Sequence, residues 1–243
     1  MTMTPQGMLR AGKQPKPRWS ACWLALALSL FPILAGAAES GSSTPPARNP
    51  ARSTFVSNVT FVVFDTETTG FSSTSDRMVE LGVVKFRNGK MLEEKSWLIN
   101  PGRKIPYWAT KVHGITDQDV KDQPTFKDVY PEFMKFISGS ILMAHNARFD
   151  IAFISEEARR ANLELPHNLV IDSLSLFRRW FPQSKSHSVE AVAKYTQVDT
   201  LVLHRAVADS MYVFLIFDKE LKSKNTGVKL RDIYDDCGGP LKF

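Results

Sequence analysis

The chain has 243 residues, of which 43% are hydrophobic, 11% aromatic and 23% charged. This composition is typical of a globular protein, and it excludes collagen, a disordered polar chain and a polytopic membrane protein. The formal net charge is +6, but four basic and no acidic residues precede residue 38, which leaves 27 basic against 25 acidic residues in the remainder. The charge alone therefore does not indicate a nucleic-acid-binding protein.

The chain begins with a leader that resembles an export signal. A basic stretch precedes Trp19 to Ala38, twenty uncharged residues that are rich in Leu and Ala. Ala35-Gly36-Ala37 is a small-x-small pattern at which signal peptidase could cut before Ala38. The run is also just long enough to span a bilayer, so residues 1–38 are predicted to be a cleaved signal peptide or an uncleaved anchor formed by residues 19–38. Either way, residue 39 onward would be periplasmic or secreted.

Residues 39–58 contain Ser, Pro and Arg without apolar periodicity, which predicts a flexible linker. The pattern after it predicts one folded domain over residues 59–221, followed by a C-terminal tail, 222–243. The basic segment from Lys219 to Arg231 is expected to be solvated.

The folded domain begins with strand patterns. Thr60 to Phe64 is a short apolar run of the kind buried inside a sheet. Val79 to Phe86 and Met91 to Ile99 are two strand-like runs, separated by Asn88-Gly89. Because Asn-Gly favours the positive φ angles of a tight hairpin turn, these two strands are predicted to be antiparallel neighbours.

Helical patterns then alternate with short strands. Thr125 and Asp128 form a capping-box pattern at the start of a predicted helix that ends near Ile137. The following predicted elements are a strand at 141–144, a helix at 147–161, a strand at 169–171 and a helix at 204–221. Strands followed by alternating strands and helices predict an α/β fold, with a mixed sheet flanked by helices.

Two carboxylates follow the first apolar strand. Asp65 and Glu67 are two residues apart, so on an extended chain their side chains point to the same side at the strand's carboxyl end. Like charges held close together repel each other, and a divalent cation between them would relieve this repulsion. The pair therefore predicts a cation site at this edge of the sheet.

Three further residues are candidates for the same site. Asp209 lies in a helix that is apolar on nearly every face, where a carboxylate is costly unless it is paired or bound to metal. An ion pair with an arginine would also explain Asp209. Asp150 enters the helix at 147–161, and alone it would be a helix-start carboxylate. His204 lies five residues before Asp209 and is expected to extend from the loop or first turn.

Together these positions resemble the DEDDh exonucleases, the superfamily of the proofreading epsilon subunit of bacterial DNA polymerase III. The three motifs are FVVFDTETTG (61–70), HNARFD (145–150) and HRAVAD (204–209), and the segments 99–120 and 187–198 are similar as well. The resemblance implies an RNase H-like fold with a mixed five-stranded sheet. It also implies that two divalent cations, Mg²⁺ or Mn²⁺, bind to Asp65, Glu67, Asp150 and Asp209. His204 would be the general base.

The family resemblance also suggests residues that hold the terminal nucleotide. Their alternative role is core packing, particularly for Phe149 and Val112. The candidates are Thr68, Gly70, Phe71, Val112, His113, Asn146 and Phe149.

The sequence therefore predicts an exported, metal-dependent 3′–5′ exonuclease that releases nucleoside 5′-monophosphates from nucleic-acid 3′ ends, with single-stranded DNA favoured. No polymerase partner is expected, because of the export leader and because only 34 residues follow Asp209. Two alternatives remain: an exoribonuclease of the same family, and an inactive module that binds nucleic-acid ends.

Overall fold

The computed structural model describes residues 49–198, 205–224 and 227–243. Five strands form one mixed sheet in the order β3-β2-β1-β4-β5. β1 pairs antiparallel with β2 and parallel with β4. This arrangement confirms the predicted five-stranded mixed sheet. The strands are β1 (Thr60–Thr68), β2 (Met78–Arg87), β3 (Lys90–Leu98), β4 (Ile141–Ala144) and β5 (Val170–Asp172).

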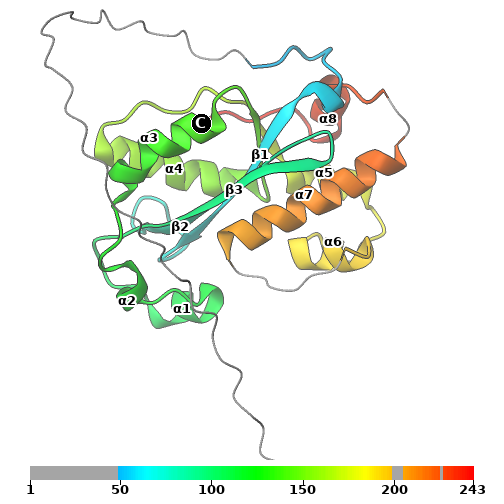
Figure 1. Cartoon of the computed structure of the whole chain (residues 1–243). Coiled ribbons are helices and arrows are strands. Elements are labelled where there is room, and N and C mark those ends of the chain that lie inside the picture. Colours follow the sequence, from blue (N-terminus) through cyan, green and yellow to red (C-terminus); the bar gives the residue numbers. More distant parts are fainter. Residues whose placement is uncertain (1–48, 199–204, 225–226) are drawn as a thin grey trace, which may run out of the picture. The chain divides into compact units, whose positions relative to one another are not determined.

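Helices cover both faces of the sheet, with α3 and α4 on one side and α6 and α7 on the other (Figure 1). The predicted helices correspond to α3, α4 and α7, although residue 204 lies outside the described residues. The α-helices are α1 (Tyr107–His113), α2 (Asp117–Val120), α3 (Phe126–Ile137), α4 (Ala147–Ala161), α5 (Ser173–Trp180), α6 (Val189–Tyr195), α7 (Ala206–Ser223) and α8 (Leu230–Asp236). A short 3-10 helix spans Val56–Asn58.

The alternation of side chains along β1 divides the core in two. Phe61 and Val63 pack with residues of α5, α6, α7 and α8, whereas Val62 and Phe64 pack with residues of α3 and α4. Successive side chains of a strand point to opposite faces of the sheet. Continued past Phe64, the same alternation directs Asp65 and Glu67 toward the α7 face and Thr66 toward the α4 face.

Gly82 of β2 lets α7 approach the sheet closely. A Cβ atom at Gly82 would lie 2.3 Å from backbone atoms of Ala206 and Val207, at the start of α7. Gly82 is also the β2 partner of Asp65 in the sheet register. The absence of a side chain here therefore brings the first turns of α7 next to the end of β1.

The ends of the described region pack against the domain. Within the predicted linker, Phe55 pairs with Lys229 and Val56 is buried. The segment predicted as a C-terminal tail contains α8, in which Leu230, Ile233 and Tyr234 are buried. Because these residues recur at helical spacing, α8 packs an apolar face on the core, which the expectation of a solvated segment overlooked.

Within the described residues, none of the helices combines the length and hydropathy that a membrane crossing requires. The predicted signal peptide or anchor, residues 1–38, lies outside the described part of the chain.

Candidate active site

Three carboxylates meet where β1 ends beside α7. Asp65 and Glu67 come from β1, and Asp209 comes from the first turn of α7. Each offers an oxygen atom, and these atoms lie within 4.8 Å of one another. We call these three residues the acidic cluster. The structure thus brings together three of the four carboxylates that the sequence pointed to.

Asp150 reaches the same region from the opposite face of the sheet. It lies in the first turn of α4, with only 2% of its surface exposed. The backbone N–H and the hydroxyl of Thr66 both donate to its Oδ1, at 3.0 and 2.8 Å. Thr66 therefore fixes Asp150 behind the strand that carries Asp65 and Glu67.

Burial, together with the charges of neighbouring carboxylates, raises the pKa values of the carboxyl groups at the site. Burial, and then the charges of Asp150, Glu67 and Asp209, raises the pKa of Asp65 well above its ordinary value. Burial and the charge of Asp209 raise the pKa of Glu67 to about 8. Burial raises the pKa of Asp150 to about 7, although hydrogen bonds from Thr66 oppose the shift. The site thus concentrates more negative charge than the surrounding protein neutralises.

The start of α7 is anchored by an ion pair between a buried carboxylate and a half-exposed arginine. Glu80 of β2 is 1% exposed, and its two oxygens accept from Nε and Nη2 of Arg205 at 3.0 and 2.7 Å. The N–H of Ala206 also donates to Glu80, at 3.2 Å. Burial alone would raise the pKa of Glu80, but the hydrogen bonds from Arg205 and Ser96 lower it. Arg205, four residues before Asp209 at the end of the HRAVAD motif, thus pairs with Glu80.

Asp172 connects the starts of α4 and α5. Its Oδ1 accepts from the N–H of Ala147 at 3.1 Å and from the N–H of Leu174 at 3.2 Å. Asn146 precedes α4 in a left-handed conformation, with φ 61°, which asparagine tolerates. The carboxylate of Asp172 therefore holds the turn that leads to Asp150. Sequence reasoning missed this residue, although an Asp between a strand and a helix is a recognisable N-cap signal.

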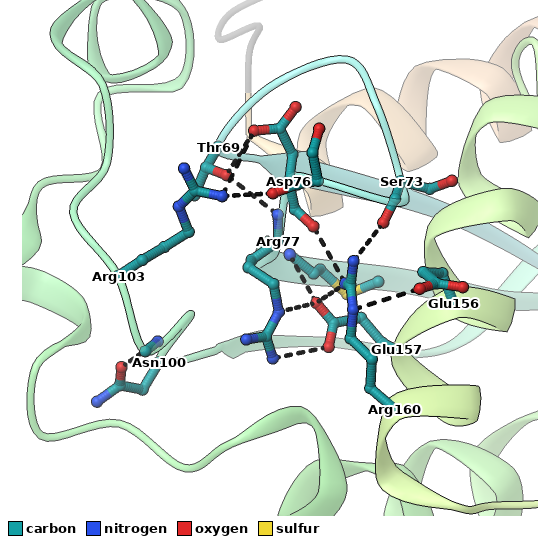
Figure 2. A network of polar contacts seen from close by, with 12 residues as sticks. Thr69, Ser73, Asp76, Arg77, Asn100, Arg103, Glu156, Glu157 and Arg160 are labelled. Atoms are coloured by element: carbon teal, nitrogen blue, oxygen red, sulfur yellow. Dashed lines mark hydrogen bonds and ion pairs between the residues drawn. The ribbon is translucent and has the colours of Figure 1, made fainter.

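The loop after β1 is held by two arginines (Figure 2). Arg160 of α4 donates to the backbone carbonyls of Ser73 and Thr74 at 2.7 and 2.9 Å, and Arg103 donates to the carbonyl of Ser75. Glu157, 2% exposed, pairs with Arg77 at 2.7 Å and with Arg160 at 3.3 Å. These contacts hold the loop that follows β1 against α4.

The predicted nucleotide-binding residues at the end of β1 have different environments. The hydroxyl of Thr68 donates to the carbonyl of Gly70 at 2.6 Å. A Cβ atom at Gly70 would lie 2.2 Å from the carboxylate of Asp76, so a larger residue here would displace that side chain. Phe71 is 80% exposed and stacks on Trp108 with ring centroids 5.2 Å apart.

The remaining candidates lie on α1 and around the start of α4. Val112 is exposed, but His113 is buried and its Nδ1 accepts from the N–H of Ile115 at 3.0 Å. Asn146 is exposed, and Phe149 packs on Phe153 with ring centroids 4.8 Å apart. Phe71, Val112 and Asn146 are therefore exposed, whereas His113 is buried. His204 lies outside the described residues.

The residues present suit hard divalent cations. Carboxylate oxygens are the ligands that Mg²⁺ and Mn²⁺ prefer. Burial, reinforced by neighbouring carboxylates, raises the pKa values of Asp65 and Glu67, and bound cations would favour their ionised forms. The acidic cluster, with Asp150 on the other face of β1, thus offers oxygen ligands suited to such cations.

Comparisons with known proteins point to one family. A family model described as "Exonuclease" matches residues 62–217. The DNA polymerase III PolC-type of Caldanaerobacter subterraneus subsp. tengcongensis is 39% identical over 170 residues, which are 70% of this chain and 12% of that protein. The PolC-type polymerase of Clostridium perfringens is 36% identical over 173 residues, 71% of this chain and 12% of that protein. The chain thus spans about 12% of the length of these relatives.

Solved structures agree on the fold. Exonuclease X, in complex with 5′-overhanging duplex DNA, is 29% identical with a TM-score of 0.55, over 71% of this chain and 98% of that chain. The nuclease domain of 3′hExo, a DEDDh family member bound to rAMP, has a TM-score of 0.62 at 14% identity, over 74% of this chain and 100% of that chain. The RNase H-like fold expected from the sequence is therefore confirmed. Since the family model covers most of the chain, this protein belongs to the exonuclease family, and its fold is similar to that of a DEDDh exonuclease.

Proposed function

We propose that the domain removes nucleotides one at a time from the 3′ end of a nucleic-acid strand and releases nucleoside 5′-monophosphates. The observation that carries this proposal is the meeting of Asp65, Glu67 and Asp209 within 4.8 Å, with Asp150 directed to the same strand end. Burial and, after it, the charges of the neighbouring carboxylates raise the pKa of Asp65, a cost that bound cations would offset.

In this proposal the four carboxylates hold two divalent cations, Mg²⁺ or Mn²⁺, and the scissile phosphodiester lies against them. Cations held there would lower the pKa of the attacking water and stabilise negative charge on the departing 3′ oxygen. His204 accepts the proton of that water, since an imidazole titrates near neutral pH. Thr66 and Asp172 hold Asp150 in place, and Glu80 holds the start of α7.

The test is incubation of the purified protein with Mn²⁺ and a 5′-labelled single strand. Progressive shortening from the 3′ end is expected, and Asp65→Ala should abolish it. A protein that binds the strand but shortens it no faster than Asp65→Ala does would instead be an end-binding module. Such a module has no need of the general base that His204 supplies in this proposal.

We propose single-stranded DNA as the favoured substrate. The support for DNA over RNA is the similarity to DNA polymerases and to exonuclease X, whose structure contains a 5′-overhanging duplex DNA, at identities of 29% or more. The structure with rAMP is only 14% identical, so it supports the fold alone. Rates on DNA and RNA strands of matched sequence test this proposal, and faster cleavage of RNA would contradict it.

We also propose that the protein acts outside the cytoplasm and without a polymerase partner. The support is the leader, in which a basic stretch precedes an uncharged run of twenty residues and a small-x-small pattern. Copurification with a replicative polymerase would contradict the absence of that partner.

A further inference from the structure

A positively charged side chain lies beside the acidic cluster. Glu80 of β2 is the sheet partner of Glu67, and the Cβ atoms of directly opposite residues lie about 5 Å apart on the same face of a sheet. Nε and Nη2 of Arg205 donate to the carboxylate of Glu80 at 3.0 and 2.7 Å. The guanidinium of Arg205 is therefore held next to a carboxylate of the acidic cluster.

The charge of Arg205 acts on that carboxylate. Burial and the neighbouring carboxylates raise the pKa of Glu67, whereas Arg205 lowers it. The hydrogen bond to Glu80 is the main cause that raises the pKa of Arg205, and the charge of Glu67 adds to it. Because Coulomb interactions weaken with distance, these effects agree with the sheet register, which puts the guanidinium at the edge of the cluster.

Glu80 occupies only one edge of the guanidinium. It accepts from Nε and Nη2 of Arg205, and Nη1 donates no hydrogen bond to another residue in the described part of the chain. The carboxylate side chain is 1% exposed, but the arginine side chain is 48% exposed. Since a guanidinium has five N–H donors in a planar fork, the edge formed by Nη1 and Nη2 can still donate to a second acceptor.

The backbone of Arg205 is fixed as well. Arg205 immediately precedes α7, and its carbonyl accepts from the N–H of Asp209 at 3.0 Å. The N–H of the next residue, Ala206, donates to Glu80 at 3.2 Å. One short segment therefore carries both a carboxylate of the acidic cluster and the guanidinium. A ligand of Arg205 does not have to order this side chain, which favours affinity.

A phosphate is the acceptor that suits this edge. Guanidinium groups bind phosphate oxygens through two parallel N–H···O bonds, which the pair of Nη1 and Nη2 can supply. In the proposed function, the phosphodiester to be cut lies against cations held by Asp65, Glu67 and Asp209. Arg205 lies at the side of that position, on the strand next to Glu67.

We propose that Arg205 binds the phosphate of the nucleotide that is removed, and that Glu80 is a positioning residue that holds the guanidinium in place. The inference rests on the proposed exonuclease function. It adds to the four carboxylates and His204 a phosphate-binding side chain, whose charge persists at every pH at which the protein folds.

The first test measures binding of a product, so that cleavage does not interfere. Thymidine 5′-monophosphate is titrated into the full chain in the presence of Mn²⁺, and calorimetry gives the affinity. Arg205→Gln is expected to weaken binding about tenfold, the loss of a hydrogen bond to a charged group. Arg205→Lys should restore part of the affinity, because it keeps the charge without the fork. The affinity for Mn²⁺ alone should not fall in either variant.

The matched control is Arg52→Gln. Arg52 is also an exposed arginine in an ion pair, with Asp235 of α8 at 3.1 Å, and α8 carries no residue of the site. This variant is expected to bind the monophosphate and Mn²⁺ like the unchanged protein.

A double-variant cycle tests the role of Glu80. Glu80→Gln alone should weaken binding of the monophosphate less than Arg205→Gln does, because the guanidinium is retained but held less firmly. If Glu80 acts through Arg205, adding Glu80→Gln to Arg205→Gln should cause no further loss. The double variant also leaves no buried charge without its partner, so it tests the proposal even if Arg205→Gln alone folds poorly.

Unchanged affinity for the monophosphate in Arg205→Gln and in the double variant would overturn the proposal. So would an equal fall in Mn²⁺ affinity, since Arg205 would then serve only the packing of α7. Additive losses in the cycle would overturn the positioning role of Glu80. An unchanged protein that binds the monophosphate through Arg205 but never shortens a strand would overturn the proposed function alone.

Discussion

At the scale of single residues, the acidic cluster retains protons that free carboxyl groups lose. The folded state raises the pKa of Glu67 from its ordinary value of 4.5 to about 8. Between these two pH values the folded protein binds more protons than the unfolded chain. Without a divalent cation, the free energy of unfolding should therefore fall as pH rises through this window.

Glu67→Gln should remove much of this dependence, because the amide carries no charge at either pH. In chelator at pH 8, the variant is expected to be more stable than the unchanged protein by more than about 1 kcal/mol. Urea denaturation at a series of pH values measures the effect. Glu94→Gln, at an exposed position of β3, is the matched control and should leave the profile as it is. A profile that stays equally steep in Glu67→Gln would argue against the raised pKa.

His204 allows a second prediction at this scale. Removal of a general base slows proton transfer without removing a cation ligand, so His204→Ala should lower kcat about 100-fold or more. Mn²⁺ binding, measured by calorimetry, should stay close to that of the unchanged protein. Equal losses of turnover and of Mn²⁺ affinity would contradict the assigned role.

At the scale of elements, the approach of α7 to β2 determines whether the acidic cluster can form. Gly82→Ala would place a methyl group 2.3 Å from backbone atoms at the start of α7. Backbone atoms cannot move aside as the end of a flexible side chain can. We expect α7 to shift outward, with a loss of about 1–3 kcal/mol in stability and weaker Mn²⁺ binding.

The control for Gly82→Ala is Val192→Ala on α6, which also removes core packing but lies on an element that carries none of the site residues. It should lose stability and keep its affinity for Mn²⁺. If Gly82→Ala and Val192→Ala lost Mn²⁺ affinity to the same extent at matched stability, the close approach would have no special role in the site.

The elements differ in how far the sequence could predict them. The β2–β3 hairpin was predictable because Asn88 and Gly89 have the positive φ angles, 49° and 70°, that their residue types favour. α1 and α2, of seven and four residues, are too short to show a clear helical period. α8 lies in residues 222–243, which were predicted as a C-terminal tail, although its apolar positions have helical spacing.

The sequence predicts a site residue where a rule for neighbouring positions, such as the alternation of side chains along a strand, determines its direction. Asp65 and Glu67 follow from strand alternation alone, whereas the partners of Glu80 and Asp150 depend on the fold. Arg205 is 125 residues from Glu80, and Thr66 is 84 residues from Asp150. No periodicity in the sequence connects such distant positions. The isolated Gly82 within a strand did carry a usable signal, since glycine there often marks a close backbone approach.

At the scale of the whole molecule, the main prediction concerns the leader. If residues 1–38 direct export and the small-x-small pattern is cleaved, the protein recovered from the periplasm or medium should begin at Ala38. Mass spectrometry of the intact protein measures this. Full-length protein in the membrane fraction would instead identify residues 19–38 as an anchor.

Ala37→Leu provides the control for cleavage, because a large residue next to the cut should not fit signal peptidase. This variant should accumulate at full length in the membrane while its exported domain still folds and cleaves nucleic acid. Full-length, unprocessed protein in the cytosol would contradict export. The exonuclease activity would then act on intracellular nucleic acid, and a polymerase partner would have to be reconsidered.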